Sequence, residues 1–168
     1  PDATTVAWLQ GRAHVPKGDA FARAAADWLS LRSDAGAVFD AEIAIDGSAI
    51  RPMATWGTTP DAGSAIGEAV PVPTDASGAK ALAYMGFTAG EATTGHAVDV
   101  VFIGSCTNGR LPDLRAAADI LRGRKVKAGL RMLVVPGSEA VRRDAEAEGL
   151  DRVFVAAGAE WRIPGCSM

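Results

Sequence analysis

The sequence is poor in cysteine and carries little net charge. It contains only two cysteines, Cys106 and Cys166, and its formal net charge at pH 7 is -3, with a pI near 5.4. The near balance of acidic and basic residues provides no electrostatic footprint for nucleic acid or for an anionic membrane, so neither partner is expected. These shortages favour chemistry on a small molecule.

Long apolar runs are also lacking. No stretch is long enough to cross a bilayer, and the first residues, "PDATTVAWLQGR", lack the basic flank and apolar run of a signal peptide. We therefore expect a cytoplasmic protein, in which a disulfide between Cys106 and Cys166 is disfavoured. Apolar residues make up 48% of the chain, which favours a folded rather than a disordered protein.

The first half of the chain has a mixed pattern. Residues 19–31 carry apolar side chains at the spacing of one helical face, with Asp19 as the expected N-cap. Residues 37–46 alternate between apolar and polar side chains and predict a half-buried strand. Residues 51–74 are rich in Pro, Gly and Thr and predict a long irregular connection. A short helix over 76–85, stopped by Gly86, is expected to follow.

From Val98 onward the pattern is regular. Apolar strands over 98–104, 131–137 and 151–158 alternate with helices over 111–123 and 138–149. Such alternation predicts an α/β fold with a parallel β-α-β-α-β layer, preceded by part of a second α/β domain. We place the boundary near residue 95. Residues 1–95 are then a partial domain with an irregular inter-domain connection, and residues 96–168 are a layer that is incomplete at its C-terminus.

Both cysteines follow predicted strands. In parallel sheets, ligands bind outside the carboxyl ends of the strands. Cys106, in "IGSCTNGR", and Cys166, in "IPGCSM", are both expected at such ends. This placement favours a functional role over the alternative of two buried, unpaired thiols. His14 and His96 are close to neither cysteine in sequence and are interpreted as a turn residue and a loop residue. Zinc and iron-sulfur sites both need more ligands than two thiols, unless the chain has been cut.

Two segments carry a specific resemblance. "VFIGSCTNGRLPDLRAAADILRGRKV" and "GAEWRIPGCSM" resemble the two cluster-ligand signatures of the aconitase family. The second signature has the form Gly-Cys-x-x-Cys in that family, and here it stops before its second cysteine. "PDATTVAWLQGR", "PKGDAFARAAADW", "TWGTTP" and "ALAYMG" further resemble large subunits of the 3-isopropylmalate dehydratase (isopropylmalate isomerase) branch. The chain is therefore expected to be an internal piece of such a subunit, truncated before the third cluster cysteine.

The resemblance implies a site and a reaction. Family members hold a 4Fe-4S cluster through three cysteines, so Cys106 and Cys166 are the implied metal ligands. The open iron acts as a Lewis acid in an enzyme that isomerises 2-isopropylmalate to 3-isopropylmalate, by dehydration and rehydration, in leucine biosynthesis. A separate small subunit is the implied partner. Ser105, Thr107 and Asn108 are candidates for hydrogen bonds to the cluster, with ordinary turn and capping chemistry as the alternative.

The family's acid, base and substrate-binding residues are implied to lie outside this chain. We therefore expect the isolated chain to lack the cluster and to be inactive.

Three further residues carry expectations of their own. Gly109 stands where these large subunits more often have serine, a change expected to matter little. Arg162 faces either an acidic substrate or solvent, and Trp56 either lines the cleft or packs at the domain junction.

Other interpretations stay open. Homoaconitase or aconitase shares the cluster signatures, because substrate choice rests largely on residues not present here. A non-catalytic Rossmann-like module with buried thiols is the alternative from a different class. A dinucleotide-binding domain is weaker still, since "GSCTNGR" is not the G-x-G-x-x-G of that fold.

Overall fold

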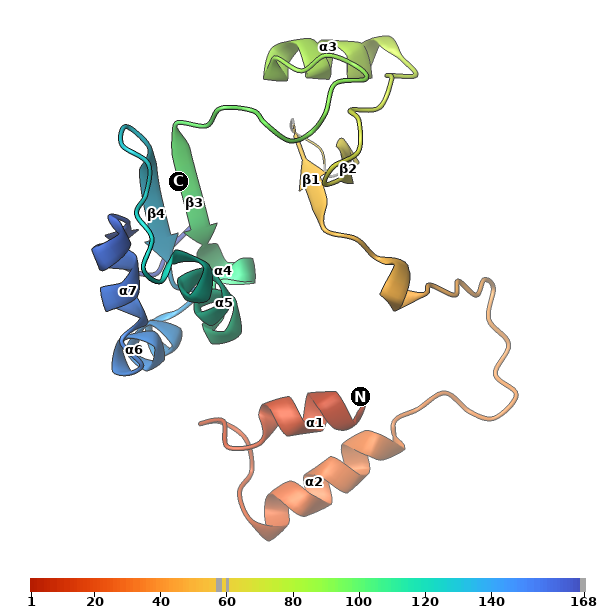
Figure 1. The fold of residues 1–168 in the computed structure, drawn as a ribbon. Coiled ribbons are helices and arrows are strands. Elements are labelled where there is room, and N and C mark those ends of the chain that lie inside the picture. Colours follow the sequence, from red (N-terminus) through yellow and green to blue (C-terminus); the bar gives the residue numbers. More distant parts are fainter. Residues whose placement is uncertain (57–58, 60, 167–168) are drawn as a thin grey trace. The chain divides into compact units, whose positions relative to one another are not determined.

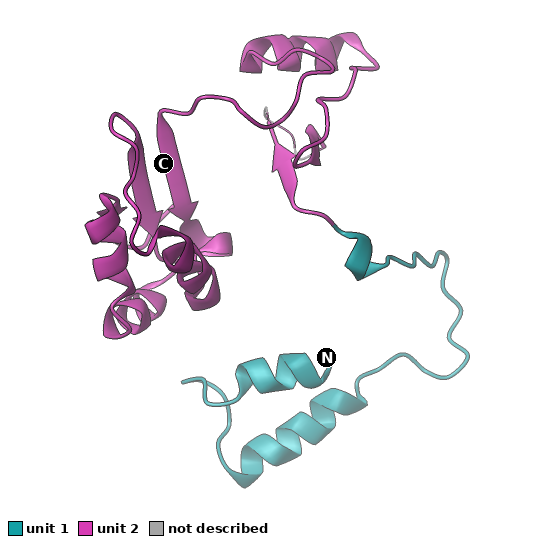
Figure 2. Ribbon diagram, viewed as in Figure 1, with its two compact units in different colours: residues 1–50 teal, residues 51–168 magenta. Residues whose placement is uncertain are grey.

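The chain forms two compact units. The structure is a computed structural model that describes residues 1–56, 59 and 61–166. The units are Pro1–Ile50 and Arg51–Met168 (Figure 2). The boundary expected near residue 95 lies inside the second unit and stays a prediction. Among the described residues, no helix has both the length and the hydropathy needed to cross a membrane.

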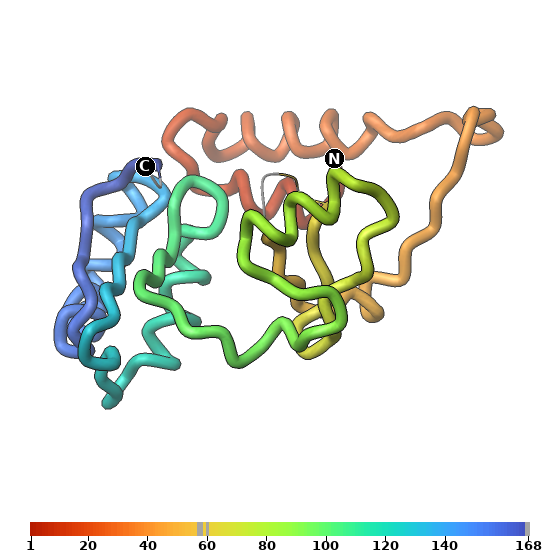
Figure 3. Tube along the Cα trace, turned by 90° about the horizontal axis from the view of Figure 1, so that it is seen from above, coloured from red at the N-terminus to blue at the C-terminus, as the bar shows by residue number. Residues whose placement is uncertain are grey.

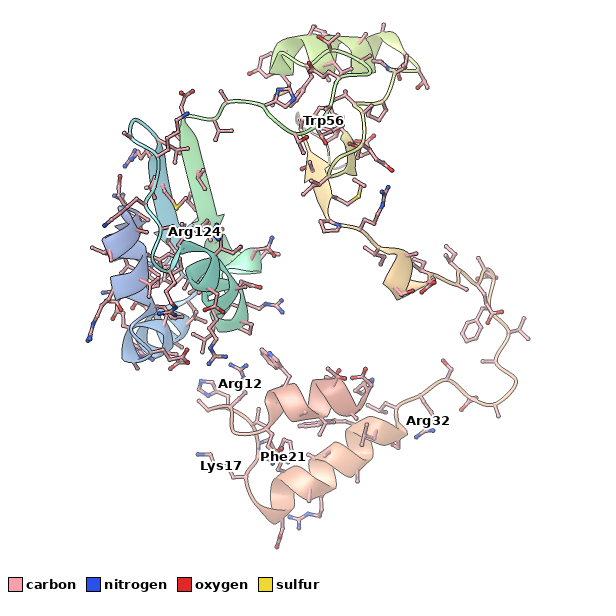
Figure 4. The ribbon with its side chains drawn as sticks, in the orientation of Figure 1. Arg12, Lys17, Phe21, Arg32, Trp56 and Arg124 are labelled. Carbon is pink, nitrogen blue, oxygen red and sulfur yellow. The ribbon has the colours of Figure 1, made fainter. Side chains whose placement is uncertain are left out.

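Unit 1 consists of two helices and a short turn of 3-10 helix. These are α1 (Ala3–Leu9), α2 (Asp19–Ser30) and η1 (Gly47–Ala49). Helix α2 confirms the predicted helix, although Gly18 is its N-cap and Asp19 lies in the first turn, where a carboxylate favours the helix dipole. Phe21 and Trp28 pack edge to face with ring centroids 6.0 Å apart. The Arg12 guanidinium lies 3.9 Å from the centre of the Trp8 ring (Figure 4).

The predicted strand over 37–46 is wrong. These residues form no strand and are exposed, with Phe39, Ile43 and Ile45 at 53%, 85% and 74% of full exposure. A strand needs a partner for its backbone hydrogen bonds, and among the described residues of unit 1 no other strand is present. Alternation of side chains therefore did not suffice to form a strand here.

Residues 51–96 build a small region around Trp56. Strands β1 (Met53–Thr55) and β2 (Gly63–Ala65) pair antiparallel, which is a hairpin inside the predicted irregular connection. Helix α3 (Ala76–Met85) matches the predicted helix and ends at Gly86 in the left-handed conformation. The buried core of this region consists of Trp56, Val70 and Leu82, and Phe87 packs against them. Trp56 is 8% exposed.

Residues 100–161 form the parallel α/β layer that the sequence predicts (Figure 1). Strands β3 (Val100–Gly104), β4 (Arg131–Val135) and β5 (Glu160–Trp161) lie in the order β3-β4-β5, and both neighbouring pairs are parallel. The path from β3 to β4 runs through α4 (Ser105–Asn108) and α5 (Leu111–Leu121), and the path from β4 to β5 runs through α6 (Glu139–Ala147) and α7 (Leu150–Ala157). The colours of Figure 3 trace this path from green to blue. The α/β fold class is thereby confirmed.

The third strand is not where the sequence analysis placed it. Residues 150–157 form helix α7, and the last strand begins at Glu160. The buried residues of α7 are Leu150, Phe154 and Ala157, which is the spacing of one helical face. Gly149 and Gly158, both left-handed, bound the helix. The run "RVFVAA" is apolar enough to suggest a strand, but its burial follows the helical period.

The helices cover one face of the sheet. Ile103, Val134 and Trp161 are neighbours in the register and therefore share a face. They pack against a core formed by α5, α6 and α7, whose buried members include Leu114, Ala118, Ala145, Leu150 and Phe154. Val100 and Phe102 alternate to the other face and are 54% and 37% exposed. The packing of the helices on this face therefore fixes the positions of the carboxyl ends of the strands.

Glu146 links α6 to β5 and predicts part of the acid sensitivity of the layer. Trp161 Nε1-H donates to Glu146 Oε1 at 3.0 Å, and Arg142 Nε donates to the same oxygen at 2.8 Å. These hydrogen bonds, that from Trp161 first, hold the pKa of Glu146 below its ordinary value of 4.5. A carboxyl group with a lowered pKa adds stability above its ordinary pKa, and that stability is lost as the pH falls through the lowered pKa.

We therefore expect Glu146→Gln to lower the unfolding midpoint at neutral pH and to flatten the decline of the midpoint as the pH falls below the ordinary pKa of a glutamate. The measurement is thermal unfolding, followed by circular dichroism, over a pH series. Asp144→Asn, which changes an exposed carboxylate on the same helix, is the matched control. Parallel pH profiles for Glu146→Gln and the natural protein would contradict the expectation.

Candidate functional site

Cys106 lies at a sharp turn where β3 ends. Gly104 has a φ of +115°, and Ser105 has a φ of +73° as the single non-glycine residue with a left-handed φ among those described. Helix α4 starts at Ser105, so Cys106 is in its first turn and is exposed. A left-handed conformation costs free energy for a residue with a Cβ and is concentrated at functional sites. The turn therefore marks this strand end as the first candidate site.

Two hydroxyl groups flank the Cys106 sulfur. Ser105 Oγ donates to Sγ at 3.9 Å, and Thr107 Oγ1 lies 3.8 Å from it. The hydrogen bond with Thr107, followed by that with Ser105, lowers the pKa of the Cys106 thiol. Because the thiolate is the form that binds metal, this environment favours ligation. Asn108, the third predicted neighbour, is exposed at the last position of α4.

The Cys106 loop packs directly on the loop that follows β4. Gly137 N-H donates to the Gly109 carbonyl oxygen at 2.8 Å. A Cβ built on Gly104 would lie 1.9 Å from the Val135 carbonyl oxygen. A Cβ built on Gly137 would lie 3.1 Å from the Gly109 oxygen and 3.2 Å from the Ser105 oxygen. The two loops therefore meet backbone to backbone, and a side chain would clash severely at Gly104 and crowd the facing backbone at Gly137.

Gly109 also occupies a position without room for a side chain. It is buried, and a Cβ there would lie 2.4 Å from the Ser105 oxygen and 2.8 Å from the Gly137 nitrogen. The expectation that glycine at this position matters little stays a prediction, and a serine would fit this loop only if the facing backbone moved. The contact escaped the sequence analysis because it joins residues from two strand ends. The Pro-Gly pair directly after a buried strand was the available signal.

Cys166 lies in the segment after β5. It is a free, exposed thiol, as is Cys106. The backbone of this segment starts by pairing with β4, since Arg162 N-H donates to the Val134 oxygen at 3.0 Å. The Arg162 side chain binds Glu160 at 3.0 Å, and Glu160 also binds Arg131 at 2.7 Å. Arg162 is therefore engaged in a surface ion-pair cluster of the layer.

The structure brings some of the candidate residues together and leaves others apart. Ser105, Cys106 and Thr107 share one turn, whereas Cys166 lies on a different segment. His96 Nε2 lies 2.8 Å from the Ala92 oxygen, and its ring packs on Phe87, in the region around Trp56. Within residues 1–56, 59 and 61–166, no group of three or more His, Cys, Asp or Glu side chains is placed to hold a metal ion.

A hollow of about 460 Å³ lies beside Trp56. Its wall includes Pro71, Pro73 and the start of α3 at Ser77 and Gly78. Trp56 thus packs in the core of its own region and also lines this hollow, and the two roles expected for it, in the cleft or at the domain junction, stay predictions. Among the described residues that line this hollow, none is a cysteine or a histidine. It is a weaker candidate than the Cys106 turn.

The fold of the layer and the position of the Cys106 thiol together indicate the class of protein. A parallel α/β layer with an activated cysteine at the carboxyl end of its first strand is suited to hold a thiolate-ligated group at the sheet edge. Residues 1–168 match the aconitase family (aconitate hydratase), and the chain therefore belongs to this family. Membership implies hydro-lyase chemistry in general, and proteins of this family usually bind a 4Fe-4S cluster.

The thiols fit such a cluster in kind but not in number. Iron-sulfur clusters are held by cysteine thiolates, and Cys106 is exposed and carries a lowered pKa. The described residues supply two thiols, whereas a 4Fe-4S cluster requires more thiolate ligands than two. By their chemistry Cys106 and Cys166 suit part of such a ligand set, and the described residues do not complete it.

Proposed function

We propose that this chain belongs to the large subunit of a 3-isopropylmalate dehydratase. The assembled enzyme isomerises 2-isopropylmalate to 3-isopropylmalate by dehydration and rehydration, a step of leucine biosynthesis, together with a small subunit. The family match supports the class of reaction. The narrower assignment rests on the resemblance of "PDATTVAWLQGR", "PKGDAFARAAADW", "TWGTTP" and "ALAYMG" to large subunits of that branch.

Cys106 carries the proposal. As a thiolate it is a ligand of the 4Fe-4S cluster, with Cys166 as a second ligand and a third cysteine outside the described residues. When bound, the cluster supplies a Lewis acid that makes hydroxide a feasible leaving group from a hydroxy acid. The hydroxyl groups of Thr107 and Ser105 lower the pKa of the Cys106 thiol and so favour the thiolate.

The substrate is tested in the assembled enzyme. We expect the natural protein, reconstituted anaerobically with iron and sulfide and combined with its small subunit, to convert 2-isopropylmalate faster than citrate or homocitrate. Ultraviolet absorption of the alkene intermediate follows the dehydration step directly. A preference for citrate or homocitrate would assign the chain to the aconitase or homoaconitase branch instead.

Loss of one ligand tests the cluster site. We expect Cys106→Ser to abolish the stable visible absorption of a 4Fe-4S cluster after anaerobic reconstitution, because serine does not replace a thiolate ligand for iron. Iron and sulfide per chain are measured together with the spectrum. Cys166→Ser should have the same effect.

Unfolding curves of both variants serve as the control, since each cysteine is exposed and its replacement should leave the fold intact. A full cluster in folded Cys106→Ser protein would remove Cys106 from the ligand set. No cluster even in the natural protein would favour a non-catalytic module.

A further inference from the structure

We infer that Gly137, on the loop after β4, is a positioning residue that holds the Cys106 turn in place. Gly137 carries no ligating or acidic group, and its role follows from its backbone contacts alone. The inference rests on the proposed function in one respect, namely that the Cys106 thiol has to be held for cluster binding.

The first step of the argument is the location of the contact. Gly137 N-H donates to the Gly109 oxygen at 2.8 Å, and Gly109 is the residue at which helix α4 ends. The Ser105 oxygen, at the start of the same helix, lies 3.2 Å from the point where a Gly137 Cβ would be. Gly137 therefore contacts both ends of the short segment that carries Cys106.

The second step is that Gly137 is itself anchored. Val135 and Pro136, which precede it, are buried, and Val135 pairs with Gly104 in the parallel register of β3 and β4. Ser138, which follows it, caps α6 by accepting a hydrogen bond from Val141 N-H at 3.2 Å. The loop after β4 is thus fixed on both sides and acts as a firm support for the Cys106 turn.

The third step concerns the turn that needs support. Helix α4 has only four residues, and it starts with the left-handed Ser105. So short a helix is not stable alone, and a left-handed residue persists only where its surroundings enforce it. The backbone contact with Gly137 supplies that enforcement. Without it the Cys106 sulfur would lose its fixed direction.

A methyl group at position 137 is a mild test of this role. The Cβ would lie 3.1 Å from the Gly109 oxygen, so the neighbouring backbone has to move by a few tenths of an ångström. The φ of Gly137 is not left-handed, and alanine can adopt it. The apolar core of the layer does not include this loop. Gly137→Ala should therefore shift the Cys106 turn while the layer stays folded.

The experiment compares Gly137→Ala with two control variants in the natural protein. Gly47→Ala places the same methyl group where no atom lies within 4 Å, again without a left-handed φ. Ala118→Gly weakens the fully buried face of α5 without touching either loop. The first controls for the substitution itself and the second for a general loss of stability.

Two measurements are made on each variant. Amide hydrogen exchange of the cluster-free protein should be faster over residues 104–110 in Gly137→Ala, and unchanged there in Gly47→Ala. After anaerobic reconstitution, iron should be lost to a chelator about 10-fold faster or more in Gly137→Ala, which is the usual size of an effect on residues that orient ligands. Ala118→Gly should lower the unfolding midpoint and leave the rate of iron loss unchanged.

The outcomes separate this inference from the proposed function. Exchange and iron loss equal to those of Gly47→Ala would overturn the role of Gly137. Absence of a cluster from the natural protein would overturn the proposed function and the use of the turn for cluster binding, while faster exchange at 104–110 would still show the contact between the loops. If Gly137→Ala does not fold, alkylating Cys106 with a bulky reagent should speed exchange of the Gly137 amide. The reference is Cys106→Ser protein, in which only Cys166 is alkylated. If the Gly137 amide exchanges at the same rate in both proteins, the role of Gly137 is rejected.

Discussion

Replacing Gly104 by alanine is expected to separate the carboxyl ends of β3 and β4 and to prevent the Cys106 turn from forming. The added Cβ would lie 1.9 Å from the Val135 oxygen and 2.8 Å from its carbonyl carbon, and both are backbone atoms of the paired strand. The φ of +115° is strained for any residue with a Cβ, at about 1–3 kcal/mol. Relief of the clash costs about 1–3 kcal/mol more, as in other overpacked sites.

Gly123→Ala is the matched control for this prediction. Gly123 is also left-handed, with a φ of +73°, but no atom lies within 4 Å of its would-be Cβ. Chemical unfolding of the two variants therefore separates the cost of the backbone conformation from the cost of the clash. The two variants should differ by more than about 1 kcal/mol, with Gly104→Ala the less stable. Equal stability would mean that β3 and β4 do not approach as closely as described.

Phe154→Ala is the second change expected to have a large effect. The Phe154 ring is fully buried in α7 and stacks on Trp161 of β5, with centroids 5.7 Å apart and the planes 9° from parallel. Removing such a side chain from a packed core costs about 3–5 kcal/mol. Because small domains are stable by only about 5–15 kcal/mol, this loss brings the layer close to unfolding at ambient temperature.

Denaturant unfolding at 25 °C measures this loss, and Val155→Ala is the control. Val155 is the next residue of the same helix and is 59% exposed, so its truncation should change stability by less than about 0.5 kcal/mol. Phe154→Leu keeps most of the volume and gives a measurable intermediate value if the alanine variant does not fold. A small effect of Phe154→Ala would show that α7 does not pack on the sheet.

The parallel layer could be predicted because its signals are local. The apolar runs of β3 and β4 and the helical patterns of α5 and α6 each define a structure within a few residues, and all four elements are found as expected. Helix α3 and its stop at Gly86 follow for the same reason. These elements were predicted because residues close in sequence determine them, although the short hairpin of β1 and β2 was missed.

The sequence-based predictions are wrong where residues distant in sequence determine the local structure. The alternation over 37–46 has no strand to pair with among the described residues of its unit, and α7 shows a helical face only when Leu150 and Ala157 are considered with Phe154. A run with Val153, Phe154 and Val155 at its centre is ambiguous by composition, since β-branched and aromatic residues favour strands. Packing against α5, which contacts α7 across the core, selected the helix.

The candidate site likewise has one part that the sequence predicts and one part that it does not. Cys106, Ser105 and Thr107 are adjacent in sequence, and their meeting at one turn follows from the strand that precedes them. The support from Gly137 was not predicted, because it depends on which strand lies beside β3 and on how closely two backbones approach. Side-chain chemistry can be recognised in a sequence, whereas a missing side chain that permits contact is recognised only in the fold.

The two thiols stand after the first and the last strand of the layer, with β4 and its flanking helices between them. A group bound by both would therefore tie the ends of the layer together and close a loop of about 60 residues in the unfolded chain, worth about 4 kcal/mol in the chain-entropy treatment of cross-links. The bound group would then act as a cross-link as well as a reagent. Its loss would return that loop-closure entropy to the unfolded chain and destabilise the layer, so that chemical damage to the site and unfolding of the layer would be coupled events.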